Sequence, residues 1–259
     1  MKKKPKNNKK TSWGNVAHWY DDLLKKDNIY QNEVILPNLV KLMKIKSSDN
    51  ILDLACGQGI FSREFAKLGA KVTGVDISDE LIKIAKKKSE SNINYFVSSA
   101  NNLSFINNES FDKVSIILAL QNIDNISSVF MECYRVLKTK GKLYFVLNHP
   151  AFRVPRKSDW EYDEKNKMQY RRVGRYLSET MVNIDMNPGE KNQKYKQFTV
   201  SFHRPIQTYF NSLNTSGFSV SNLFEWISNK KSQDGPRQKT EDVARKEIPM
   251  FMCIEAVKN

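Results

Sequence analysis

Short apolar runs alternate with helix-compatible segments over most of this 259-residue chain. Runs rich in β-branched and aromatic residues that end at turn residues are typical of strands. Such runs occupy residues 51–54, 72–75, 93–97, 111–120, 142–147, 217–220 and 248–256. Strands that alternate with helices predict an α/β fold, in which helices cover both faces of a mostly parallel sheet.

Two of the helices between these strands follow from the residue pattern. One is expected at 60–66, directly after a glycine-containing turn. In a later segment the apolar residues that share one helical face are Val129, Phe130, Cys133, Val136 and Leu137. Gly141 follows a basic last turn, so we expect the second helix to end there.

The turn between the first strand and the first helix is the most informative segment. It reads Asp53-Leu54-Ala55-Cys56-Gly57-Gln58-Gly59. Glycine lacks a Cβ atom, so such a turn lets the backbone approach a nucleotide-like ligand closely. Asp76 ends the next apolar run, nineteen positions after Gly57, where a carboxylate can accept both ribose hydroxyls. Asp76 can also be an ordinary acid at a helix start, although Ser78 already fits the capping role there.

The turn departs from the two common phosphate-binding patterns. A G-x-G-x-x-G dinucleotide fingerprint would need glycine where Ala55 and Ser62 stand, and G-x-x-x-x-G-K-[ST] is absent. The remaining pattern, D-x-A-x-G-x-G, resembles the first motif of class I S-adenosylmethionine (SAM)-dependent methyltransferases of the type 11 kind. Their ligand has no phosphate and carries a cationic sulfonium and amine, which suits the acid at Asp53.

The resemblance extends along residues 45–148 and, less closely, 203–259. It implies a Rossmann-like, seven-stranded, mostly parallel sheet whose last two strands are related as a hairpin. Ser99 and Ala100 stand where the family often has an acid-alanine pair beside the adenine, and Asn101 offers a replacement acceptor.

The same resemblance implies SAM as the cofactor and a set of contacts to it. Asp76 would bind the ribose, Ile77 would pack on the adenine, and the glycines would let backbone approach the methionine moiety. The expected cofactor-binding residues are Tyr20, Asp53, Ala55, Gly57, Gly59, Asp76, Ile77, Ser99, Ala100, Asn101, Ala119, Leu120 and Gln121. Tyr20 belongs to a Trp19-Tyr20-Asp21 element that resembles one in the family's leading helix, and it can equally be a core aromatic.

Five segments organise the chain. We expect a disordered basic arm at 1–11, two cap helices at 12–44, the SAM-binding core at 45–148, a substrate-lid insertion at 149–202 and the end of the core sheet at 203–259. Within the insertion, 167–176 and 195–203 are expected strands. Residues 228–242 are polar and are expected to form a mobile loop.

Candidates for chemistry on the acceptor lie mainly in and beside the insertion. Histidine is the side chain most able to accept a proton near neutral pH, so His149 and His203 are candidate bases, although each can equally be structural. Tyr170 and three arginines, Arg153, Arg171 and Arg204, are candidates for substrate binding, because arginine recognises carboxylates and phosphates. Ion pairs with Asp159, Glu161 or Asp163 are an alternative use of these arginines.

Composition limits the class of protein. No apolar run reaches the roughly 20 residues needed to cross a bilayer, and the lysine-rich start has no apolar stretch behind it, so we expect neither a membrane span nor a secretory signal. Three cysteines without metal spacing favour a reducing cytoplasm and no metal site. The net charge of +14 permits an RNA partner, but no RNA-binding motif occurs, and lysines on solvated faces explain it as well.

The sequence therefore predicts a SAM-dependent methyltransferase that acts on a small molecule. A tRNA or RNA methyltransferase and a SAM-binding regulatory protein without turnover are the alternatives. A nicotinamide oxidoreductase is disfavoured by the missing third glycine. The acceptor, the methylated atom and the oligomeric state do not follow from the sequence.

Overall fold

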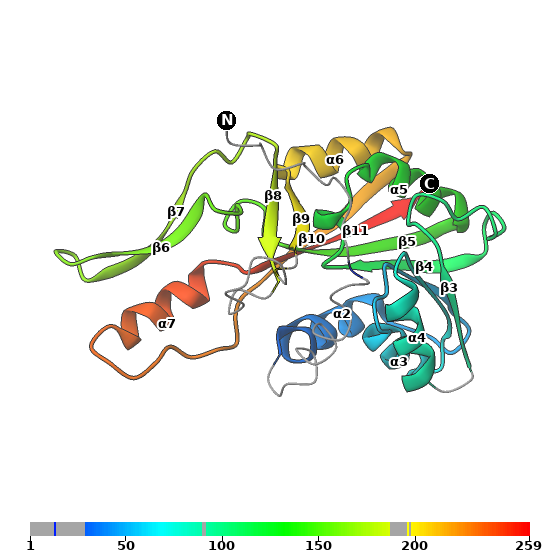
Figure 1. Cartoon of the computed structure of the whole chain (residues 1–259), viewed down its shortest axis with the longest axis horizontal. Helices are drawn as coiled ribbons and strands as arrows, with labels where there is room; N and C mark the ends of the chain where they lie inside the picture. Colours follow the sequence, from blue (N-terminus) through cyan, green and yellow to red (C-terminus); the bar gives the residue numbers. More distant parts are fainter. Residues whose placement is uncertain (1–12, 14–28, 90–91, 187–195, 197) are drawn as a thin grey trace.

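A computed structural model describes residues 13, 29–89, 92–186, 196 and 198–259. Its largest element is a seven-stranded sheet in the order β10-β11-β5-β4-β1-β2-β3 (Figure 1). The strands are β1 Asn50–Leu54, β2 Lys71–Asp76, β3 Ile93–Val97, β4 Phe111–Ile117, β5 Leu137–Asn148, β10 Phe218–Trp226 and β11 Phe251–Lys258.

The sheet is parallel except at one strand. β1 to β5 pair in parallel with their neighbours, whereas β11 runs antiparallel to both β5 and β10. The Rossmann-like, seven-stranded, mostly parallel sheet expected from the sequence is therefore confirmed, including the antiparallel pair near the end of the chain. In such a sheet the carboxyl ends of β1, β2 and β4 meet at one edge.

Helices cover both faces of the sheet (Figure 1). On one face lie α2 Leu36–Met43, which a π-helical turn η1 Gln31–Ile35 precedes, α3 Ile60–Lys67 and α4 Asp79–Lys88. On the other lie α5 Ile126–Val136 and α6 Ile206–Thr215, with the 3-10 turn η2 Leu120–Asn122 beside them. Ser78 caps α4 by accepting a hydrogen bond from the N–H of Leu81, as the sequence predicted.

Strict alternation along β5 explains why two cores form. Leu143, Phe145 and Leu147 are buried against α5 and α6, whereas Tyr144 and Val146 are buried in the core on the opposite face. Successive side chains of a strand point to opposite faces, so a continuous apolar run serves both layers.

The insertion folds into two hairpin-like pairs. β6 Ser158–Asp163 pairs antiparallel with β7 Met168–Val173, and β8 Thr180–Asp185 pairs with β9 Phe198–His203. β7 and β9 lie within the strands predicted at 167–176 and 195–203. Their partners β6 and β8 were not predicted, although Trp160 and Tyr162 of β6 alternate with acids and Val182 and Ile184 of β8 alternate with polar residues. With α7 Gln238–Glu247, which packs on β7, the β6–β7 pair extends away from the main sheet (Figure 1).

Two predicted boundaries are wrong. The helix expected to end at Gly141 ends at Val136, because β5 already begins at Leu137 and passes through Gly141, with a register shift against β4. The loop expected at 228–242 is shorter, since α7 begins at Gln238. Tyr20 and the basic arm at 1–11 lie outside the described residues, so the lid role of Tyr20 stays a prediction.

Candidate active site

The turn between β1 and α3 is built on left-handed backbone. Ala55, Gly57 and Gly59 have φ angles of 58°, 56° and 74°. The N–H of Gly59 donates to the carbonyl of Cys56 at 3.0 Å, and the N–H of Cys56 donates to the carbonyl of Val75 in β2 at 3.0 Å. Glycine adopts positive φ without a Cβ penalty, so the two glycines allow the sharp change of direction between β1 and α3.

Asp53 lies at the base of this turn and is 2% exposed. Its carboxylate accepts hydrogen bonds from the hydroxyls of Ser62 at 2.6 Å and Ser115 at 3.2 Å. Burial raises the pKa of the Asp53 carboxyl to about 6, since loss of water penalises the charged form more than the two serines favour it. Asp53 therefore links β1, α3 and β4 through one buried carboxylate.

Replacement of Asp53 by asparagine is expected to flatten the dependence of stability on pH. With a pKa raised from 3.8 to about 6, this carboxyl stabilises the folded state fully below pH 3.8, and that contribution is lost as the pH rises through 6. Between pH 4 and pH 7 the wild-type protein should thus lose about 2 kcal/mol relative to the variant. Urea unfolding of both proteins at the two pH values measures this difference, and parallel pH profiles would contradict it.

Asp76 ends β2 on the same side as the turn. Its Oδ2 accepts the N–H of Gly57 at 2.9 Å and its Oδ1 accepts the N–H of Ser78 at 2.9 Å. Burial raises the pKa of the Asp76 carboxyl above its usual range, and the two backbone donors oppose that shift. The carboxylate thus joins the turn after β1 to the start of α4.

These groups surround a cavity of about 540 Å³ at the carboxyl ends of β1, β2 and β4. This size falls within the range of small-molecule sites. The predicted cofactor-binding residues that line it are Asp53, Ala55, Gly57, Asp76, Ile77, Ser99, Ala100, Asn101 and Ala119. The hydroxyl of Ser99 donates to Oδ1 of Asn101 at 2.7 Å, so these two residues act together at one wall.

Three other predicted cofactor residues do not line the cavity. Gly59 forms the N-cap of α3, beneath the turn. Leu120 is fully buried in the core beside α5, and the buried Oε1 of Gln121 has no hydrogen-bond partner. The structure therefore gives Gly59 and Leu120 a place in the scaffold around the cavity.

Sequence reasoning did not assign the rest of the lining. The further lining residues are Trp13, Gln31, Cys56, Gln58, Ile60, Phe61, Leu81, Ser98, Ile117, Leu118, Asn122, Ile123, Asp124, Asn125 and Phe202. Gln58 and Ser98 are neighbours of predicted residues, and wider windows around each strand end would have included them. Phe202 and Gln31 come from distant parts of the chain, and no local pattern points to them.

The two candidate bases lie away from this cavity. His149 is 1% exposed; its Nε2 bonds the carboxylate of Glu225 at 2.6 Å and its Nδ1 accepts the N–H of Ala151 at 3.2 Å. Burial lowers the pKa of His149, against the effect of Glu225. His203 is 4% exposed and its Nε2 donates to the carbonyl of Tyr176 at 2.7 Å. The structure does not support the base role that the sequence suggested for either histidine.

None of the four candidate substrate residues belongs to the described lining of the cavity. Tyr170 is exposed and its hydroxyl donates to Glu161. Arg171 donates to the carbonyl of Phe152 at 2.9 Å. Arg204 is buried and donates to the carbonyls of Ile123 at 2.9 Å and Asp124 at 2.5 Å, both in the segment that lines the cavity after β4. Arg204 thus positions a wall of the cavity. Arg153 is considered separately below.

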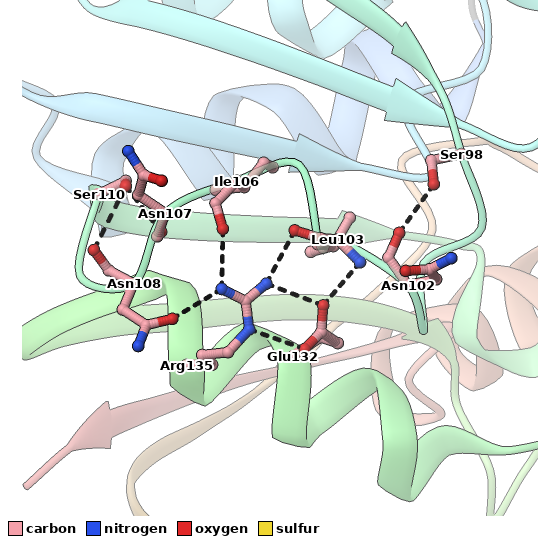
Figure 2. Close-up of polar contacts among 9 residues, drawn as sticks. All are labelled: Ser98, Asn102, Leu103, Ile106, Asn107, Asn108, Ser110, Glu132 and Arg135. Carbon is pink, nitrogen blue, oxygen red and sulfur yellow. Dashed lines mark hydrogen bonds and ion pairs between the residues drawn. The ribbon is translucent and has the colours of Figure 1, made fainter.

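An ion pair on α5 holds the loop that follows β3 (Figure 2). Arg135 donates to the carbonyls of Leu103 and Ile106, each at 2.8 Å, and to both carboxylate oxygens of Glu132. Glu132 in turn accepts the N–H of Leu103 at 2.6 Å. This loop begins with the lining residues 98–101, so α5 fixes one cavity wall from behind.

Replacement of Arg135 by methionine should loosen that wall. The change removes hydrogen bonds from a charged donor to two carbonyls, so we expect the free energy of unfolding to fall by about 2 kcal/mol. Ligand affinity at the cavity should fall as well, because residues 98–101 lose their support. Urea unfolding and ligand titration measure the two effects. Met131→Gln, which changes an exposed residue of the same helix, is the control. Equal stability and equal ligand affinity of the two variants would contradict the role of Arg135.

Comparison with known proteins decides the class of this site. Residues 52–145 match the family described as a methyltransferase domain. This stretch is a methyltransferase domain. The matched residues run from β1 to β5 and include the turn, Asp53 and Asp76. The family resemblance that the sequence suggested is confirmed.

The curated relatives match this domain and little beyond it. The chain is 35% identical over 97 residues to a ubiquinone biosynthesis O-methyltransferase of Xanthomonas oryzae pv. oryzae, which covers 36% of this chain and 41% of that protein. It is 32% identical over 113 residues to a demethylmenaquinone methyltransferase of Tropheryma whipplei, covering 42% and 46%. The matches thus span less than half the length of these relatives.

Solved structures match over a longer stretch of this chain. A SAM-dependent methyltransferase from Mesorhizobium loti superimposes with a TM-score of 0.68 at 24% identity, over 86% of this chain and 96% of that one. A structure from Listeria monocytogenes assigned to the same class has a TM-score of 0.65 at 26% identity, over 85% and 96%. The fold therefore agrees beyond the methyltransferase domain.

Among the described residues, no helix is long and apolar enough to cross a membrane. Nor do three or more histidine, cysteine or acidic side chains in that part of the chain gather where a metal ion would fit.

Proposed function

We propose that this chain transfers the methyl group of SAM to a small-molecule acceptor. The observation that carries the proposal is the charge of the cavity at the strand ends. Its described lining contains three carboxylates, Asp53, Asp76 and Asp124, and no lysine, arginine or histidine. A cavity of this kind favours a ligand with positive charge, and SAM carries a sulfonium and an amine.

The arrangement of the lining supports one orientation of SAM. Asp76 would accept the ribose hydroxyls while the N–H groups of Gly57 and Ser78 hold its carboxylate. Ile77 would pack on the adenine; it is an apolar side chain left 61% exposed at the cavity, and a flat ring would cover it. Ala100 and Asn101 would meet the adenine edge, and Asp53 and Ala119 the methionine end.

Methyl transfer from a sulfonium is an in-line displacement at carbon. The acceptor atom forms a bond to the methyl carbon as the carbon–sulfur bond breaks, and the electron pair stays on sulfur. The protein must align three atoms and exclude water. Phe202, Asn122 and Ile123 of the described lining would contribute to this alignment. No base in the described lining is required for an acceptor that is already ionised.

An RNA acceptor is the alternative, and the distribution of lysines weighs against it. Lys44, Lys46, Lys138 and Lys140 gather around a hollow beside the starts of β4 and β5. That hollow lies at the opposite edge of the sheet from the cavity. An RNA methyltransferase would need its basic face around the methyl donor, where it would contact phosphates.

The test is transfer of a labelled methyl group from SAM into a cell extract, with one half treated with RNase. We expect label in small molecules of both halves, and none with heat-inactivated protein. Label that RNase removes from the macromolecular fraction would favour the RNA alternative. Measurable SAM binding without label anywhere would favour a regulatory protein without turnover.

A further inference from the structure

Arg153 follows β5 and is partly buried, yet its guanidinium donates no hydrogen bond within the described part of the chain. Its Nε is buried without a partner. A guanidinium has five N–H donors in a planar fork, and buried donors in folded proteins are nearly always paired. The buried, unpaired Nε–H of Arg153 therefore needs a separate explanation.

The groups around Arg153 make its charge harder to accommodate. The Cζ atoms of Arg153 and Arg171 lie 5.8 Å and 5.2 Å from the centre of the same Trp160 ring. Burial lowers the pKa of Arg153, and the charges of Arg171 and of Arg245 in α7 lower it further. Three arginines from three elements thus lie together, with Trp160 holding two of them in place.

Nearby carboxylates are occupied by other groups. Glu225 bonds His149, and Asp242 accepts the N–H of Ser232 at 2.7 Å. Burial lowers the pKa of Arg171, and the charge of Asp159 opposes that shift. Of the described groups that act on Arg153, the hydroxyl of Tyr30 is the one that favours its charged form. No carboxylate in the described part of the chain forms an ion pair with Arg153.

We infer that Arg153 binds an oxyanion, a carboxylate or phosphate group of the methyl acceptor, with Arg171 and Arg245 beside it. The inference rests on the proposed function. A planar guanidinium matches either group with two parallel hydrogen bonds. Tyr30, which acts on Arg153, directly precedes the lining residue Gln31, and Arg153 follows the carboxyl end of β5, at the same edge of the sheet as the cavity. The acceptor would then be anchored by its charged end and react at the other.

Binding of the anion can be tested without turnover. The Nε–H resonance of Arg153 is followed by NMR while inorganic phosphate or succinate is added to the full chain. We expect a shift that saturates with at least one of the two probes and is absent from Arg153→Met. The probe that saturates first distinguishes phosphate from carboxylate. The absence of a saturating shift with either probe would overturn the inference whether or not the protein turns over.

Turnover provides the second test. In the extract experiment we expect the labelled product to be retained by an anion-exchange resin at neutral pH. Arg153→Met should lower the rate of labelling at least about tenfold and leave SAM affinity unchanged, while Arg153→Lys recovers part of the rate. Arg172→Met is the matched control, an exposed arginine of β7 paired with Glu161.

The outcomes separate this inference from the proposed function. A neutral labelled product, or wild-type rates in Arg153→Met, would overturn the anion site and leave the methyltransferase proposal standing. A parallel loss of SAM affinity in Arg153→Met would also overturn it, because Arg153 would then act on the cofactor or on the fold.

Discussion

Replacement of Asp76 by alanine is expected to weaken SAM binding about a hundredfold. In the proposed binding mode the carboxylate accepts two ribose hydroxyls, and in the structure it accepts the N–H of Gly57 at 2.9 Å. Alanine removes both the contacts to the ligand and the contact that fixes the turn. Calorimetric titration of SAM into wild-type protein and variant measures the change.

Two further variants make this result specific. Asp76→Asn keeps one acceptor oxygen, so its SAM affinity should lie between that of Asp76→Ala and that of the wild-type protein. Asp79→Ala removes an exposed carboxylate three residues later, which pairs with Lys83 on the surface of α4, and should leave SAM affinity unchanged. Equal SAM affinity in Asp76→Ala and the wild-type protein would refute the ribose assignment.

Replacement of Gly59 by alanine should lower the free energy of unfolding by about 4 kcal/mol. Gly59 has a φ of 74°, which disfavours any side chain, and an added Cβ would overlap the hydroxyl of Tyr95 and lie 2.9 Å from its Cζ. Tyr95 is buried, and its ring lies against Gly74, so it has little room to move. Urea unfolding measures the loss.

Gly57→Ala is the matched comparison, because the two glycines differ in their surroundings. A Cβ at Gly57 would meet no atom within 4 Å, although its φ of 56° is also left-handed. We expect a smaller loss of stability, about 1 kcal/mol, and a clear loss of SAM affinity, since the new methyl group would enter the cavity. The same loss of stability in both variants would refute the distinction between a glycine that faces the ligand and one that faces the core.

The main features of the fold were predictable because their causes are local. β1, β4 and β5 contain short apolar runs with consecutive buried residues, and a strand buried on both faces requires such a run. The turn at residues 53–59 was recognisable because positive φ demands glycine. Asp76 was recognisable because it directly follows a strand, and the carboxyl ends of parallel strands meet at one edge.

The insertion was less predictable because its strands are stabilised by contacts with other segments. β6 and β8 are six-residue strands without a fully buried residue, and β7 and β9 supply their hydrogen-bonding partners. The end of α5 was misplaced for a related reason. Pairing with β4 draws Leu137 into β5, which overrides the stop signal at Gly141.

Residue type alone did not assign the histidines and arginines correctly to the cavity. His149 directly follows a strand at the edge that holds the cavity, but its ring is held by Glu225 and Ala151. Arg204 is a cation that donates to the carbonyls of the wall after β4. Which way a long polar side chain points depends on acceptors far away in the sequence.

The sequence by itself determined the Rossmann-like sheet, the glycine-containing turn and the acid after β2, because each depends on a few consecutive residues and their backbone geometry. Only the tertiary structure decided which polar side chains reach the cavity, and it left Arg153 among two other arginines without an ion-pair partner in the described part of the chain. These outcomes depend on burial and on partners from distant segments, and no spacing along the chain encodes them.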